Sequence, residues 1–388
     1  MSVQVSYKKQ FTFFIILSLI FLGIIEISLH VIEPKCNFVL SEIFSEYDTF
    51  KKNELCSAYQ SLEYNQKGPI SYLVPNQYYN YLNINSDGFR GNEIIDDGKY
   101  RIIFLGGSTV FGIVTTSDQI TIPALVEKKL NEKKFNVQVI NAGIPSATSI
   151  DELYLLENDL LKYNPDLVVM YDGWNDIGER NKIKFNIEYE EFKENTVIEN
   201  YEDFSNLNIE NTIQIRSGTG ILTFLSDINY KTGIGLVIFV RDNLILNSNI
   251  IKNEVKSFQN TSDLILIENR LKNNWEKVCN LGEENSFKTV NIIQPSLGTS
   301  SRNLSDEETI QMSLSNFRMD DFNYLKKLDI KKLENNKCKN IIDLRNTFEG
   351  IKGKTIFFDA VHVSDYGNNI ISEKIIQVLI PIIKNDFQ

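Results

Sequence analysis

The chain has 388 residues, 42% of them hydrophobic and 11% aromatic, which is enough apolar material for a substantial core and excludes wholesale disorder. Its formal net charge is -11, so it lacks the surplus of Lys and Arg from which nucleic-acid-binding proteins draw their affinity. We therefore expect no nucleic-acid partner. A single α/β domain with insertions can take up this length, and we expect one such domain with accessory segments.

An apolar segment begins after Lys8 and Lys9 and continues to Ile32, about the length that spans the hydrocarbon of a bilayer. Glu26 and His30 lie one helical turn apart at its outer end, where they could pair or reach the interface. An uncleaved anchor is favoured over a cleaved signal peptide because no A-x-A site follows. The two lysines place the N-terminus in the cytoplasm and the rest of the chain outside.

The four cysteines are Cys36, Cys56, Cys279 and Cys338. None of them has the C-x-x-C spacing of a zinc site, and no cluster of His, Cys and carboxylates suggests a bound metal or cofactor. An extracytoplasmic address would favour disulfides, and two local bonds are one of the three pairings that four cysteines allow. Four free buried thiols are the alternative.

From Tyr100 onward, apolar strand patterns alternate with helical spacing. The predicted order is strand, helix, strand, helix, strand, over residues 100–109, Gln119–Lys134, 136–143, Asp151–Tyr163 and 165–173. Continuous apolar strands joined by helices predict a parallel sheet covered on both faces, with functional loops at the carboxyl ends of the strands.

The rest of the chain extends this domain. We predict an anchor over 1–34, a juxtamembrane lead-in over 35–98 and the α/β domain over 99–388, with an inserted cap at about 180–285. A fourth strand follows the insertion at Phe287–Pro295, and the irregular segment 296–309 is predicted to form a rim or lid of the cleft. A final helix, capped by Ser364 or Asp365, closes the sheet.

Three of the predicted strands end in distinctive loops. In the first loop, GGST, Ser108 would lie at the start of a helix, where free N–H groups favour a developing anion, so it is a candidate nucleophile. The second and third loops offer the Gly143 N–H and the Asn175 side-chain amide, which with the Ser108 N–H would make a three-donor oxyanion hole. For each loop alone, a helix cap or a simple turn is the competing interpretation.

His362 is the only histidine outside the N-terminal apolar segment. Asp359, three residues before it, can reach its Nδ1 atom around a turn, while Nε2 faces a serine from the first loop. The sequence therefore predicts a catalytic triad of Ser108, Asp359 and His362.

These residues give the chain a resemblance to the SGNH hydrolases, also called GDSL-type esterases and lipases. The four defining positions of the family match Ser108 in FLGGST, Gly143 in NAGIPS, Asn175 in GWND and His362 in DAVH, and Asp359 falls at the D-x-x-H position. The G-D-S of the family is G-G-S here. This departure affects what the resemblance implies about the substrate more than it affects the assignment of Ser108 as the nucleophile.

The resemblance covers roughly residues 80 to 385. It includes the lead-in NSDGFRGNE, Asn85–Glu93, which is similar to the stretch before the first strand in membrane-anchored and polysaccharide-associated members. It implies a three-layer α/β/α sandwich with a parallel, flavodoxin-like sheet. It also implies hydrolysis or transfer of an acyl group on oxygen, without a cofactor or metal.

With the predicted anchor, the resemblance favours an esterase that acts on an acylated envelope polysaccharide or glycolipid. Two alternatives remain open on the sequence. An O-acyltransferase that modifies a surface glycan would use the same residues, and a non-catalytic, membrane-anchored glycan-binding or assembly protein would need none of them.

Overall fold

The computed structural model describes residues 6–32, 54–55, 58–59, 61–177, 189, 193, 261–315, 319–334 and 337–386. The chain divides into two units, one of Met1–Val39 with Tyr201–Ser257 and one of Leu40–Asn200 with Phe258–Gln388. Cys36, Cys56 and most of the predicted insertion lie outside the described residues.

In the first unit, the apolar N-terminal segment forms one helix, α1, over Tyr7–Ile32. Its stretch Tyr7–Ile24 has a mean hydropathy of 1.4, and none of it is buried, so it is long and apolar enough to cross a membrane. A signal sequence near the N-terminus meets the same description, and the anchor stays a prediction. The side chains of Glu26 and His30, which could pair or reach the interface, lie outside the described residues.

The second unit is built on a five-stranded parallel sheet. Its spatial order is β6 (Val137–Asn141), β5 (Tyr100–Gly106), β7 (Leu167–Asp172), β8 (Lys288–Ile293) and β9 (Ile341–Asp343). Every residue of β5 and β7 is buried, as their continuous apolar runs predict for central strands covered on both sides. The second strand in sequence lies at one edge, so β5 and β7 flank the point where the chain reverses direction across the sheet.

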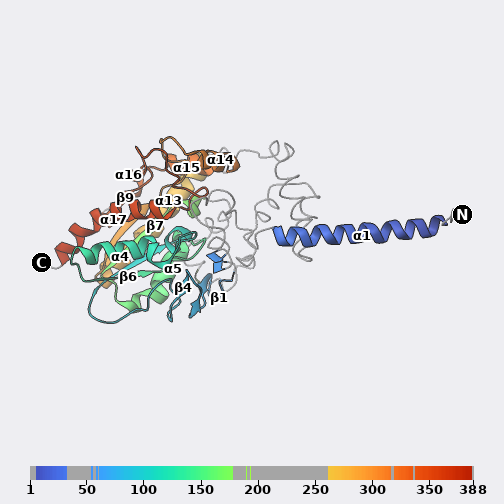
Figure 1. Ribbon diagram of the computed structural model, residues 1–388. Helices are drawn as coiled ribbons and strands as arrows, with labels where there is room; N and C mark the ends of the chain where they lie inside the picture. Colours follow the sequence, from blue (N-terminus) through green and yellow to red (C-terminus); the bar gives the residue numbers. More distant parts are fainter. Residues whose placement is uncertain are drawn as a thin grey trace. The chain divides into compact units, whose positions relative to one another are not determined.

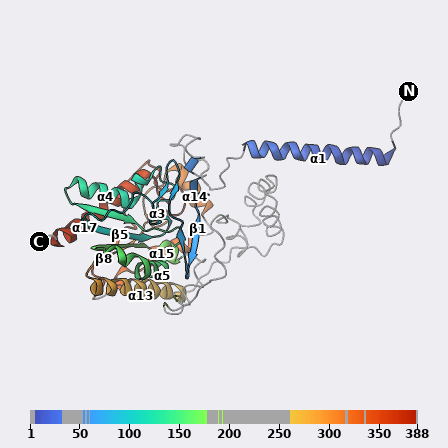
Figure 2. The ribbon, with the colours of Figure 1, turned by 90° about the horizontal axis from the view of Figure 1, so that it is seen from below.

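Helices cover both faces of this sheet (Figures 1 and 2). Helix α4 (Ile122–Glu132) and the C-terminal helix α17 (Asp365–Asp386) pack together on one face. Helices α5 (Ser149–Leu155) and α13 (Thr261–Asn285) pack together on the other. The predicted three-layer α/β/α sandwich is therefore confirmed. Helix α13 occupies the end of the predicted insertion and packs against β8.

Local capping explains where two helices differ from their predicted bounds. A 3-10 turn over Asp118–Ile120 precedes α4, and the Thr121 hydroxyl caps α4 by accepting the Ala124 N–H at 3.4 Å. Helix α5 begins early because Thr148 and Asp151 form a capping box. At its other end, α5 continues as a π-helical and then a 3-10 turn. At the start of α17, the Ser364 hydroxyl accepts the Gly367 N–H at 3.3 Å.

Several short elements of the described residues have too little periodicity for the sequence to predict them. They are the hairpins β1 (Tyr64–Lys67) with β2 (Ile70–Leu73) and β3 (Gln77–Tyr78) with β4 (Asn83–Ile84), strand β9, and the helices α3 (Ser108–Phe111), α6 (Trp174–Ile177), α14 (Asp306–Leu314), α15 (Met319–Lys327) and α16 (Ile330–Leu333).

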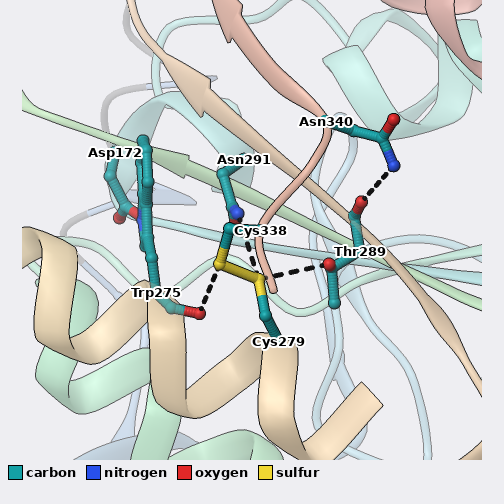
Figure 3. The surroundings of a disulfide bond; sticks show 7 residues. All are labelled: Asp172, Trp275, Cys279, Thr289, Asn291, Cys338 and Asn340. Carbon is teal, nitrogen blue, oxygen red and sulfur yellow. Dashed lines mark hydrogen bonds between the residues drawn. A yellow bond between two sulfur atoms is a disulfide. The ribbon is translucent and has the colours of Figure 1, made fainter. Parts of the chain in front are cut away.

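A disulfide between Cys279 and Cys338 joins α13 to the segment that leads into β9 (Figure 3). Both cysteines are buried. The Thr289 hydroxyl donates to Cys279 Sγ at 3.3 Å, and the Asn291 amide donates to the same atom at 3.5 Å. One of the two local disulfides that the sequence allows is therefore present, and the alternative of free thiols is wrong for this pair.

Candidate active site

Ser108 lies where the first strand of the sheet turns into a helix. Strand β5 ends at Gly106, Gly107 is the extended N-cap residue, and α3 begins at Ser108. The Phe111 N–H donates to the Gly107 carbonyl at 3.0 Å and the Gly112 N–H donates to the Ser108 carbonyl at 2.9 Å, so the helix is a single turn. The serine is thus held at the carboxyl edge of the sheet, where the sequence predicts the site.

His362 and Asp359 are presented by a narrow loop before α17. Phe357 and Val363 form an antiparallel bridge, and the Phe358 N–H donates to the His362 carbonyl at 2.9 Å. These bonds close the loop on both sides of the Asp359–His362 segment. The two side chains are therefore fixed by the local backbone rather than by a long helix or strand.

The structure brings the three predicted triad residues into one line of hydrogen bonds. Ser108 Oγ lies 2.7 Å from His362 Nε2, and His362 Nδ1 lies 2.6 Å from Asp359 Oδ2. An ionised carboxylate can only accept, so the Nδ1 atom carries the proton and Nε2 is left to accept from the serine hydroxyl. This is the tautomer that a general base next to a serine requires.

The charge state of Asp359 fits this tautomer. Burial disfavours its ionised form, but the positive charge that His362 can carry and the hydrogen bond to its ring act in the opposite direction. The second oxygen, Oδ1, accepts the backbone N–H groups of Val361 at 2.8 Å and of His362 at 2.7 Å. Together these contacts hold the pKa of Asp359 below its usual value, so the carboxylate stays ionised.

Glu308, which was not predicted from the sequence, holds the backbone that leads into the Asp359–His362 loop. This fully buried carboxylate accepts the N–H groups of Ile356 and Phe357, each at 2.9 Å, just before Asp359. It is also paired with the buried guanidinium of Arg302. Ser305 and Glu308 form the capping box of α14, and that S-x-x-E pattern is the sequence signal that could have revealed it.

Gly143 and its loop lie directly against helix α3. A Cβ at Gly143 would come 2.3 Å from the Phe111 nitrogen, which is backbone and cannot move aside, so only glycine fits. The Gly143 N–H donates to the Asn141 side-chain oxygen at 3.1 Å. A bound oxyanion would have to share this donor or displace the Asn141 oxygen.

Asn175 lies on the other side of the same serine loop. Its side-chain nitrogen donates to the Ala147 carbonyl at 2.8 Å and would lie 2.2 Å from a Cβ at Gly107. This contact explains the G-G-S sequence locally, because any side chain at Gly107 would have to displace the Asn175 amide. The structure therefore brings Ser108, the Gly143 loop and Asn175 to one place, where the sequence predicts the three donors.

Buried carboxyl groups lie behind the Asn175 loop. Asp172 ends β7 and accepts the Trp275 indole N–H at 2.6 Å, and Asp176 in α6 accepts the Ser149 hydroxyl at 2.6 Å. Burial, reinforced by neighbouring carboxylates, raises the pKa of Glu152 and of Asp172 well above the ordinary values. Burial also raises the pKa of Asp176, to about 6. Glu152 and Asp172 therefore keep the protonated form to a higher pH than ordinary carboxyl groups.

The arrangement can carry out nucleophilic chemistry on a carbonyl or a similar electrophile. It has a serine hydroxyl, an imidazole that faces it, and a carboxylate that orients the ring. Among the described residues, no group of three or more His, Cys, Asp or Glu side chains is placed to hold a metal ion.

No protein-family model matches the chain, and no curated protein matches it. Among solved structures, the acetyl xylan esterase AlAXEase is 16% identical with a TM-score of 0.37, over 71% of this chain and 98% of its own. A lipase/acylhydrolase from Enterococcus faecalis is 14% identical with a TM-score of 0.39, over 71% and 93%. A two-domain esterase active on acetylated mannans is 12% identical with a TM-score of 0.36, over 74% and 50%.

The strand order and the helix layers of the second unit establish its fold. The second unit has a parallel sheet in the order β6, β5, β7, β8 and β9 between two layers of helices. It is therefore a three-layer α/β/α sandwich in which Ser108, at the start of α3, follows β5, Gly143 follows β6 and Asn175, in α6, follows β7, while His362 contacts Ser108.

Proposed function

We propose that the protein is a membrane-anchored, extracytoplasmic serine esterase that hydrolyses O-acyl esters, and O-acetyl esters in particular, on a cell-envelope polysaccharide or glycolipid. The observation that carries the proposal is the line of hydrogen bonds from Ser108 Oγ through the His362 ring to Asp359. A serine hydroxyl, a neutral imidazole and a carboxylate in this order make a weak nucleophile reactive toward an ester carbonyl.

In the proposed reaction, His362 Nε2 takes the proton from Ser108 Oγ as the oxygen attacks the carbonyl carbon. The N–H groups of Ser108 and Gly143 and the Asn175 amide hold the charge that develops on the carbonyl oxygen. Collapse of the tetrahedral intermediate breaks the ester C–O bond, and His362 returns its proton to the leaving alcohol. Water, deprotonated by His362, then attacks the acyl-serine and releases the acid.

The proposed location in the cell is supported by two separate features. Helix α1 is long and apolar enough to cross a membrane, and Lys8 and Lys9 lie at its N-terminal end, which favours a cytoplasmic N-terminus. The Cys279–Cys338 disulfide supports an oxidising compartment for the second unit, because such bonds are rare in the cytosol. An enzyme in that position would meet envelope glycans and lipids before soluble metabolites.

The test is ester hydrolysis by the full chain in detergent, with p-nitrophenyl acetate and a series of longer acyl chains. We expect acetate to be cleaved, and Ser108→Ala and His362→Ala to lower kcat by at least ~10³-fold. Ser71→Ala is the matched control, since this serine of β2 donates its hydroxyl to Gln66 and lies outside the segments predicted to form the cleft. Unchanged activity in Ser108→Ala would refute the proposal, and the chain-length series would decide the acyl group.

An acyltransferase outcome would be visible in the same experiment. With a polysaccharide acceptor added, transfer would move label from an acyl donor to the glycan, whereas hydrolysis would release the free acid. Transfer that exceeds hydrolysis in a Ser108-dependent manner would replace water with the glycan hydroxyl in the second step and leave the residue roles unchanged.

A further inference from the structure

Arg90 belongs to the lead-in stretch NSDGFRGNE, which the proposed chemistry does not use. The stretch folds around Asn85, whose side-chain oxygen accepts the N–H groups of Asp87 at 3.0 Å and Phe89 at 2.9 Å. This turn directs Arg90 inward, and its side chain is fully buried. A buried guanidinium must have its charge and its donors satisfied, so its partners show what it is there to hold.

The partners of Arg90 are the end of the nucleophile helix, the carboxylate of Asp118, the Tyr59 hydroxyl and, from Nη2 at 3.3 Å, the Tyr81 carbonyl. Its Nη1 atom donates to the Gly112 carbonyl at 2.6 Å and to the Phe111 carbonyl at 3.2 Å, the carbonyls that end α3. Its Nε atom donates to Asp118 Oδ1 at 2.8 Å. The guanidinium carbon also lies 5.1 Å from the centre of the Phe111 ring. Asp118 is thereby the counter-ion, and α3 is the element that is fixed.

The backbone conformation and the missing side chain of Gly112 allow Arg90 to approach the end of α3. Gly112 ends α3 in the left-handed region with φ at 91°, and a Cβ there would lie 2.6 Å from Thr121 Cγ2 and 3.3 Å from Arg90 Nη1. The Tyr59 hydroxyl donates to the same Gly112 carbonyl at 2.9 Å and also accepts from Arg90 Nη1 at 3.2 Å. Ser108 lies only one turn away from this anchored end.

The segment that follows is tied to the histidine side of the site. Thr116 donates its N–H and its hydroxyl to the carboxylate of Asp365, three residues after His362. The chain from α3 to Thr116 is therefore held at one end by Arg90 and at the other by the start of α17. A shift of α3 would change the 2.7 Å distance between Ser108 Oγ and His362 Nε2.

We infer that Arg90 is a positioning residue for the Ser108 nucleophile: it locks the end of α3 through its planar fork of donors and so sets the Ser108–His362 distance. The inference rests on the proposed serine chemistry. Arg90 is fully buried and contacts the carbonyls at the end of α3, so it would act through the helix. Lysine cannot replace it, because a single ammonium group cannot reach Asp118 and two carbonyls in one plane.

The test compares Arg90→Lys with Arg101→Lys in the full chain in detergent. Arg101 is a matched control, since it is also buried and donates to the carbonyls of Tyr163 and Ile95, but it lies at the opposite end of β5. We expect Arg90→Lys to lower kcat on p-nitrophenyl acetate on the order of 10²-fold at unchanged KM, because a small misplacement of reacting groups costs this much. Arg101→Lys should keep the wild-type kcat.

Labelling of Ser108 by a fluorophosphonate, followed by mass spectrometry, gives a second readout that needs no ester substrate. The labelling rate should fall in Arg90→Lys and not in Arg101→Lys, at a temperature where thermal melting shows both folded. If Arg90→Lys does not fold, Tyr59→Phe removes one donor to Gly112 with little change in shape, and we expect a several-fold loss of kcat at unchanged KM.

Each outcome separates the two claims. Suppose that wild type is labelled and active, and that the folded Arg90→Lys variant matches it in kcat and labelling rate. The positioning role of Arg90 is then overturned, while the esterase proposal stands. The same holds for Tyr59→Phe if Arg90→Lys does not fold. If wild-type Ser108 is neither labelled nor required for ester hydrolysis, the esterase proposal fails and the role of Arg90 falls with it.

Discussion

The carboxylate of Asp359 accepts three hydrogen bonds, from the His362 ring and from the N–H groups of Val361 and His362. The contact with the His362 ring and these donors keep the pKa of Asp359 below its usual value, although its side chain is partly desolvated. The ionised Asp359 carboxylate therefore stabilises the fold at pH values above the pKa that Asp359 has in the unfolded chain. This stabilisation is lost as the pH falls through the lower pKa that Asp359 has in the folded chain. Asp359 should stay ionised over the whole range in which the enzyme is assayed.

Asp359→Asn tests the residue directly. The amide keeps the shape but can donate to Nδ1, which favours the tautomer with the proton on Nε2, where it cannot accept from Ser108. We expect kcat on p-nitrophenyl acetate to fall by ~10²–10⁴-fold at neutral pH, without loss of folding by circular dichroism. Asp97→Asn, at an exposed position, is the control. A loss smaller than tenfold would show that Asp359 does not set the tautomer.

The contacts among Ser108, His362 and Asp359 were predictable at this scale because each residue directly follows an apolar strand or falls within a short D-x-x-H spacing. Glu308 and Arg90 were not, since their partners are backbone groups distant in the sequence. The residue type of a buried arginine or glutamate does not reveal which carbonyl or N–H it will meet. Only the packed fold supplies that information.

At the scale of elements, α5, β7 and α6 meet through the carboxyl groups of Glu152, Asp172 and Asp176, with Asp151 nearby. The folded state holds protons on these groups that the unfolded chain releases, so stability should fall as the pH rises. Asp176 should contribute to this loss of stability between its ordinary pKa of 3.8 and its folded pKa of about 6. For Glu152 the pH range of the loss begins near the ordinary pKa of 4.5 and extends higher.

Glu152→Gln replaces an acid that must be protonated with a permanently neutral amide. We expect the free energy of unfolding of the variant to fall less steeply between pH 4 and 8 than that of wild type. Urea unfolding at a series of pH values measures the slope. Glu132→Gln, on the exposed face of α4, should follow the wild-type curve. Parallel curves for Glu152→Gln and wild type would mean that Glu152 does not hold its proton in the fold.

The link between α13 and β9 makes a second prediction at this scale. The Cys279–Cys338 bond closes a segment with a sequence separation of 59, for which the chain-entropy relation gives about 4 kcal/mol of stabilisation. The double variant Cys279→Ser with Cys338→Ser should lose up to about this much free energy of unfolding in urea. Wild type unfolded in a reductant should shift likewise, and equal midpoints with and without the bond would contradict the prediction.

For the molecule as a whole, the sequence predicted the sandwich because its central strands are continuous apolar runs separated by helical spacing. It did not predict β9, a three-residue strand whose residues are not buried. The hairpins β1–β2 and β3–β4 were missed for a similar reason, since each of their strands has only two or four residues. Periodicity identifies elements that bury a face, and these elements pair by backbone bonds with little apolar pattern.

Helix α1 belongs to a different unit from the sheet, and we expect it to act as an anchor that the catalytic unit does not need for folding. The full chain should stay in the membrane fraction after extraction at alkaline pH, because a spanning helix of this hydropathy is held by its apolar length. A chain that lacks residues 1–34 should be soluble and keep its Ser108-dependent esterase activity. Loss of activity and folding together would show that the catalytic fold needs residues 1–34.

The mass of the mature chain separates an anchor from a signal peptide. An intact N-terminus that includes Lys8 and Lys9 is expected for an anchor, whereas a mature protein that begins after Ile32 would identify a cleaved signal. Protease added to intact cells, or to cells whose outer layers have been opened, should digest the catalytic unit and leave α1 protected. Full protection of the catalytic unit would place it in the cytoplasm and overturn the envelope substrate.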